Sequence, residues 1–266
     1  MKTIIVGAAA VTALIAAGCG SSNGSGTTQS TTASTTPTTA SAPSGSAASL
    51  APIHGKYSPT IDPANFVATV DNRYLPFKPG TGLHYKGVAE DGKTPQTDDE
   101  VVTHQTKRIL GVNSTVVRDV VSERGTPIEK TFDWYAQDKQ GNVWYMGEDA
   151  REFHHGQSVK APDSWQAGVN GAQPGIIMPG NPQPGESYRQ EYYPGHALDQ
   201  ARVVGPNGTV NVPAGAYKRP LVTVETSSLE PGAEEQKFNA PGVGVVKEQV
   251  VKGNHERFEL VSITHS

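Results

Sequence analysis

The residues best suited to binding chemistry are charged side chains set among aromatic ones in the middle of the chain. Asp133 lies in the aromatic run Phe132–Ala136, and Arg189 and Glu191 lie two positions apart in a tyrosine-rich run. Successive side chains of a strand point to opposite faces, so Asp133 and Trp134 face opposite ways while Arg189 and Glu191 share a face. A buried carboxylate needs a partner, and the pair could contact each other or Asp133. The pattern predicts a polar ligand site on a concave sheet face; the alternative is a structural ion pair or a solvated face.

A second group holds imidazoles and carboxylates, which are the usual ligands of zinc and related ions. Glu152 and His154 come close together in the chain, and His196 follows later near Asp199. His154 and His155 are adjacent, so on a strand they point apart and cannot hold one ion without a turn. No HExxH spacing is present. The group predicts a metal site formed by Glu152, His154 and His196, or a hairpin tip exposed to solvent.

The segment Ala161–Gly185 is a third candidate, because a long irregular loop inside a compact domain is often functional. It is rich in glycine and proline and contains Trp165 and Met178. One interpretation is a cover over the sheet that presents these two side chains to a ligand beside Trp134. The other is a connector whose apolar residues fill the core.

Several function classes are excluded or disfavoured. Cys19 is the only cysteine and is taken by the predicted lipid, and no Gly-x-Ser-x-Gly sequence lies between a predicted strand and a helix, so the usual signatures of a nucleophile are lacking. No glycine-rich phosphate loop follows a strand and opens a helix, and no cofactor is expected. The formal net charge is −4 without a basic stripe, which argues against a nucleic-acid partner. Together these features lean away from an enzyme.

The elements that must position these residues are short strands separated by Gly, Asn and Asp turns. Beyond Pro79 the chain is rich in Val, Thr, Ile, Tyr and Trp, which strands favour. Helical turns are expected only at Pro63–Val67 and His196–Arg202. Strands are predicted over Leu83–Glu90, Glu100–Leu110, Thr115–Glu123, Ile128–Ala136 and Val143–Gly147.

The second half of this region repeats the first. Pro184-Gly185 follows Pro79-Gly80 by 105 positions (184 − 79), and Gln236–Ala240 follows Phe132–Ala136 by 104 (236 − 132). Phe258 follows Phe153 by 105 (258 − 153). We therefore predict an all-β fold, an internally duplicated antiparallel meander with halves at about 79–160 and 184–266, forming an open half-barrel or a sandwich. The alternative is that the two halves look alike only because both are β-rich sequences with many glycine and proline residues.

The amino terminus carries an export signal. A lysine precedes the apolar run Ile4–Ala17, which is too short to span a bilayer. The run ends at Ala16-Ala17-Gly18-Cys19, which resembles the lipobox of bacterial lipoproteins, and the resemblance implies cleavage before Cys19 and acylation of its thiol. The alternative is a secretory signal with an incidental cysteine. We predict a signal peptide at 1–18, a lipidated Cys19 with an uncharged Ser/Thr-rich tether over 19–50, and a globular domain over 51–266.

Two longer motifs carry a family resemblance. Asp133–Asp138 with Gly141–Tyr145, and Tyr188–Tyr192, resemble a group of uncharacterised bacterial exported lipoproteins. Val212–Gly215 and Ala240–Lys247 are similar to exported β families that include half-barrel lipoprotein carriers. The resemblance implies a lipid-anchored protein on the extracytoplasmic face of the cell membrane and implies no activity.

Three functions remain open from sequence. The first is a membrane-tethered module that binds a small apolar or envelope-associated ligand through Asp133, Trp134, Trp165, Met178, Arg189 and Glu191. The second is a metal-dependent hydrolase that uses Glu152, His154 and His196. The third is a structural envelope protein without a small-molecule site.

Overall fold

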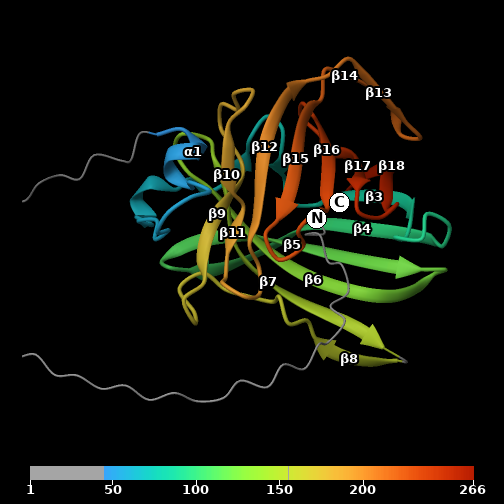
Figure 1. Cartoon of the computed structure of the whole chain (residues 1–266), viewed down its shortest axis with the longest axis horizontal. Helices are drawn as coiled ribbons and strands as arrows, with labels where there is room; N and C mark the ends of the chain where they lie inside the picture. The colour runs from blue at the N-terminus through green and yellow to red at the C-terminus, as the bar shows by residue number, and fades with distance from the viewer. Residues whose placement is uncertain (1–44, 155) are drawn as a thin grey trace, which may run out of the picture.

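The computed structural model describes residues 45–154 and 156–266. Cys19, the predicted signal peptide and the tether up to residue 44 lie outside this part of the chain. The described residues are nearly all strand and turn, which confirms the all-β prediction (Figure 1). The early elements are α1 (Ala47–Leu50), a 3-10 turn (Pro63–Asn65), β1 (Val70–Asp71) and β2 (Pro76–Phe77).

The remaining strands form two antiparallel meanders of similar length. The first consists of β3 (Thr81–Val88), β4 (Pro95–Ile109), β5 (Val112–Glu123), β6 (Thr126–Gln137), β7 (Val143–His154) and β9 (Gln173–Met178), with β8 (Gln157–Lys160) added beside β7. The second consists of β10 (Ser187–Arg189), β12 (Asp199–Pro206), β15 (Leu221–Ser227), β16 (Glu234–Ala240), β17 (Gly244–Lys252) and β18 (Arg257–His265). A separate hairpin joins β13 (Thr209–Val212) to β14 (Gly215–Lys218).

One large antiparallel sheet unites the two meanders and curves until it is nearly closed into a barrel (Figure 1). The last strand β18 pairs with β3, which joins the end of the second meander to the start of the first. On the opposite side β10 pairs with β12, while the next stretch, β11 (Glu191–Tyr192), pairs with β9. The short segment Ser187–Tyr192 therefore contains both end strands of the sheet. Its strand pairing is interrupted only at Gln190. Gly175 on β9 permits this approach, since a Cβ there would lie 2.4 Å from the Gln190 carbonyl carbon.

Equivalent backbone contacts support the two-meander organisation. Gly80 and Gly185 each precede the first strand of a meander and each has φ +86. The Gly80 N–H donates to the Val102 carbonyl and the Gly185 N–H to the Val203 carbonyl, both at 2.8 Å. The match of Phe153 with Phe258 does not hold, because these residues lie on β7 and β18, which occupy different places in their meanders.

The strand register defines an inner and an outer face, because directly opposed residues of antiparallel strands share a face. Asp133 on β6 faces Val117 on β5 and Glu148 on β7, and all three are buried on the inner face. Trp134 therefore lies on the outer face, as the alternation predicted. Phe77 stacks on the inner-face Tyr135 with ring centroids 4.5 Å apart, so the segment before β3 closes one end of the interior.

Two local predictions differ from the structure. The strand predicted to end at Gly147 continues to His154, because Gly147, at φ +125, forms a bulge opposite Trp134 and the strand resumes beyond it. The helical turn predicted over His196–Arg202 is wrong, because pairing with β15 extends the chain from Asp199 onward. The 3-10 turn Pro63–Asn65 confirms the other turn, and the Asp62 carboxylate caps it by accepting from the Ala64 N–H.

Residues before Ala51 also pack against the globular domain. Ala47 and Ala51 are buried, and the Ala48 N–H donates to the Glu186 carboxylate at 3.1 Å. The last residues of the predicted tether thus pack against the barrel beside β10. Within the described residues no helix is long and apolar enough to cross a membrane.

Candidate functional site

A tyrosine joins two carboxylates on the inner face of β6 and β7. The Tyr145 hydroxyl lies 2.6 Å from Asp133 Oδ1 and 2.7 Å from Glu148 Oε2. A phenol has one proton, so it can donate to only one of the two oxygens. The second contact is a hydrogen bond only if that carboxyl is itself protonated and donates to the phenol oxygen. The geometry therefore requires this three-residue group to hold an extra proton.

The electrostatics of the group agree with that requirement. Asp133 and Glu148 are buried, and loss of hydration disfavours their charged forms. Burial raises the pKa of Asp133 to about 7. Burial and the neighbouring Asp133 raise the pKa of Glu148 well above its usual range. Asp133 and Glu148 therefore share at least one proton near neutral pH.

The Ala161–Gly185 segment supplies the next member of the network. Trp165 Nε1 donates to Glu191 Oε2 at 2.7 Å, and its indole meets the Tyr145 ring edge-on at 5.4 Å between centroids. The segment reaches this place through Gly147, because a Cβ on Gly147 would lie 2.4 Å from the Trp165 carbonyl oxygen. The Glu148 N–H donates to that carbonyl at 2.8 Å. Asp133, Trp165 and Glu191 are thus brought together through Tyr145.

A cavity of about 330 Å³ opens next to this network, between β6, β7 and the start of the long segment. We call it the loop cavity. Trp134 lines it, with the Lys107 ammonium 3.3 Å above the centre of the indole. Burial lowers the pKa of Lys107, opposed by the charge of Asp149. The full lining combines aromatic rings, amides, a hydroxyl and charges of both signs: Lys107, Trp134, Glu148, Asp149, Lys160, Ser164, Trp165, Gln166, Val169, Asn170 and Tyr193.

Met178 and Arg189 lie away from this cavity. Met178 is buried in the main core on β9. Arg189 donates to the carbonyls of Pro52 and Ile53, both at 2.8 Å, and its guanidinium lies over the Tyr192 ring. The break in pairing at Gln190 turns Arg189 and Glu191 in different directions, so the structure does not bring Arg189 to Asp133 or Glu191.

The three predicted metal ligands form no common ligand set. His154 Nε2 lies 2.7 Å from Glu152 Oε2, whereas His196 Nδ1 contacts the Pro162 carbonyl at 3.0 Å and its ring stacks on Tyr193. Among residues 45–154 and 156–266, no group of three or more His, Cys, Asp or Glu side chains is placed to hold a metal ion.

Tyr145 and Glu148 are central residues to which the sequence assigned no binding role. Tyr145 belongs to the motif Gly141–Tyr145, and Glu148 begins the acidic and histidine-rich run that was considered for a metal site. Because a strand end was expected at Gly147, the two residues were not placed on one strand beside Asp133. Lys237 is a third such residue, since it stands 104 positions after Asp133 (237 − 133) and also faces inward, opposite Glu248.

The comparisons with known proteins place only distant structural neighbours beside this chain. No family model matches it, and no curated protein matches it. A candidate exported protein with a YmcC-like fold from Bacteroides fragilis superposes with a TM-score of 0.41 at 16% identity, over 73% of this chain and 99% of that chain. A candidate lipoprotein from Parabacteroides distasonis gives 0.39 at 10% identity over the same shares. At these scores the similarity carries no argument about ligand or activity.

Proposed function

We propose that this protein is an extracytoplasmic module, tethered to a membrane by a lipid on Cys19, that binds a small ligand in the loop cavity. The supporting observation is the convergence of Trp134 and Trp165 with several hydrogen-bonding groups on one cavity. Its volume of about 330 Å³ lies at the lower end of the range of small-molecule sites, roughly 300–1,000 Å³. The proposed anchor rests on the Cys19 motif, and the binding role rests on the cavity.

The residues that line the loop cavity indicate a more polar ligand than the small apolar one expected from the sequence. A purely apolar ligand would leave Asp149, Gln166 and Asn170 without partners when it displaced their water, which is costly. A ligand with one flat apolar face and several polar groups suits the cavity better. Its face would lie on an indole, and its polar groups would meet the amides and charges. The ammonium of Lys107 now covers Trp134, so a ligand that stacks on this ring must displace it.

Native mass spectrometry of the full chain, purified in detergent from the producing cells, tests this function. We expect a small molecule to remain bound to the wild-type protein and to be lost from Trp134→Ala. Lys86→Met, an exposed change on β3, is the matched surface control and should retain the molecule. The extracted molecule should rebind to stripped wild-type protein with one-to-one stoichiometry. No bound molecule in the wild type, or equal retention by a folded Trp134→Ala protein, would overturn the proposal.

A further inference from the structure

The interior of the barrel carries a large excess of acidic side chains. Its buried carboxylates include Asp98, Glu100, Asp119, Asp133, Glu148, Glu191, Asp199, Glu225, Glu235 and Glu248. Within the described part of the chain, Lys237 is the one basic side chain that is buried. Buried acids are tolerated when they are paired or protonated, and among residues 45–154 and 156–266 the buried acidic side chains far outnumber the basic ones.

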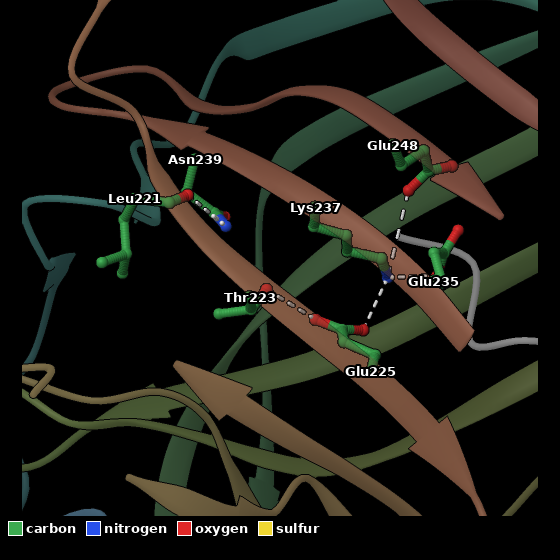
Figure 2. A network of polar contacts seen from close by, with 7 residues as sticks. All are labelled: Leu221, Thr223, Glu225, Glu235, Lys237, Asn239 and Glu248. Carbon is green, nitrogen blue, oxygen red and sulfur yellow. Dashed lines mark hydrogen bonds and ion pairs between the residues drawn. The ribbon is translucent and has the colours of Figure 1, made fainter. Parts of the chain in front are cut away.

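Lys237 is already shared among three of these carboxylates. Its Nζ lies 3.1 Å from Glu225, 3.5 Å from Glu235 and 3.9 Å from Glu248 (Figure 2). The three acids come from the adjacent strands β15, β16 and β17, so one ammonium contacts acids on three strands. Figure 2 also shows Thr223 on the same face, whose hydroxyl donates to Glu225 Oε1 at 3.3 Å. One ammonium therefore lies among three acidic side chains.

A small cavity, which we call the interior cavity, lies between this cluster and β11. Gln190, Glu191, Asp199, Glu225 and Lys237 line it together with Tyr135, Tyr145 and Ile177. The space open to the centre of a water-sized sphere is about 10 Å³, which suits one group the size of a water molecule.

One carboxylate oxygen at this cavity has no partner. Trp165 satisfies Glu191 Oε2, but Glu191 Oε1 is buried and accepts no hydrogen bond. Glu191 as a whole is only 1% exposed. The Gln190 side chain also lines the cavity, with Nε2 unpaired, and its amide can present either a donor or an acceptor by turning over. A cation that donates a hydrogen bond to Glu191 Oε1 would satisfy this buried atom and would stabilise the ionised form of the carboxyl beside other acids.

We propose that the interior cavity binds an ammonium group with at least three N–H bonds. The group is either the ammonium ion itself or the protonated end of a linear primary amine. The group donates hydrogen bonds to Glu191 Oε1 and neighbouring acceptors and supplies a second positive charge beside Lys237. Its size matches the cavity, whereas a quaternary ammonium is too large and has no N–H to donate. This site differs from the loop cavity in position and in ligand class, and it stands independently of the proposed function.

The test uses the full chain in detergent at pH 8, where simple primary amines remain protonated. Thermal unfolding is followed with ammonium chloride, spermidine hydrochloride or tetramethylammonium chloride, each against sodium chloride of equal ionic strength. We expect ammonium or spermidine to raise the unfolding midpoint with a saturable dependence on concentration, and tetramethylammonium to have no effect. Saturation by ammonium at least tenfold below the spermidine concentration identifies the free ion, and the reverse order identifies a linear amine.

Glu191→Gln is the decisive variant, because it keeps the side-chain size and removes the charge. It should weaken binding of the active amine at least tenfold. Glu234→Gln, a solvent-accessible change that affects only the partner of Lys252, is the matched control and should bind as the wild type does. If Glu191→Gln fails to fold, ¹⁵N-labelled ammonium on the wild type replaces it, and a resonance of bound ammonium that spermidine displaces is expected. The proposal is overturned if neither amine exceeds sodium, which would assign the cavity to water, or if a folded Glu191→Gln protein binds unchanged.

Discussion

Replacing Asp133 by asparagine tests the physical account of the barrel interior. The amide side chain would keep nearly the same shape and an acceptor for the Tyr145 hydroxyl, which now lies 2.6 Å from Asp133 Oδ1. It would remove the ability to ionise. The substitution therefore separates the hydrogen bond from the charge, and the pH dependence of stability reports the charge alone.

The sign follows from the shift in pKa. Burial raises the pKa of Asp133 from 3.8 to about 7, so the folded state holds this proton more tightly than the unfolded chain. The stabilisation that results is complete below the unfolded pKa near 3.8 and is lost as pH rises to about 7. At about 1.4 kcal/mol per pH unit the total loss approaches roughly 4 kcal/mol. We expect Asp133→Asn to be more stable than the wild type at pH 8 by up to that amount, and to differ by about 1 kcal/mol or less at pH 4.

Urea unfolding of both proteins at pH 4, 6 and 8 measures this difference. Glu90→Gln, an exposed carboxyl on the turn after β3, is the matched control and should follow the wild type at each pH. The reasoning is refuted if Asp133→Asn is less stable than the wild type at pH 8, because the ionised carboxylate would then be a net stabilising group.

Four further predictions follow from the same structure. Lys237→Met removes the cation that three buried acids share, and it should lower the free energy of unfolding at pH 8 by about 3–5 kcal/mol. The loss should be smaller at pH 5, because burial raises the pKa of Glu248 to about 7 and acids of this kind are then protonated. An equal loss at both pH values would contradict this prediction. Gly147→Ala places a Cβ against Trp165 and should cost about 1–3 kcal/mol and shift the tryptophan emission, whereas Gly125→Ala, also at positive φ but in open space, should leave the emission unchanged. Trp165→Phe leaves Glu191 with another unpaired oxygen and should cost about 1–3 kcal/mol in urea unfolding, and a cost near zero would show that the bond carries no stability. Cys19→Ser should abolish labelling by radioactive palmitate and move the protein from the membrane to the soluble fraction, and continued labelling would remove the lipoprotein assignment.

The strands could be predicted well from sequence because their alternation and turns are local properties. Asp133 and Trp134 lie on opposite faces as expected, and both prove to lie near a cavity or a polar network. Prediction failed where tertiary pairing overrode a local signal. The sequence predicted a strand end at Gly147, but the strand continues through a bulge there. The sequence also placed Arg189 and Glu191 on one face, but the strand pairing changes at Gln190 and separates them.

The acidic interior could not be recognised from sequence, because its members are scattered over many strands and each looks like an ordinary solvated residue. Asp98 and Glu248 lie 150 positions apart (248 − 98), yet their charges act on each other in the fold. Only the closure of the sheet turns these alternate positions into one face. The sequence suggested that the long segment covers the sheet with Trp165, but no local pattern indicated that Trp165 would donate to Glu191.

The stretch Ser187–Tyr192 affects how the protein would associate with its neighbours. The edge of an open sheet exposes unpaired N–H and C=O groups, and these can recruit a strand from a neighbouring molecule. Here β10 and β11 hold the two ends of the main sheet in register with β12 and β9, so both ends are already occupied from within. With the lipid anchor that we propose on Cys19, neighbouring molecules would share a plane and meet at high local concentration. A sheet that uses up its own ends resists intermolecular strand pairing under those conditions, and substitutions that loosen Ser187–Tyr192 would promote aggregation before they abolish folding.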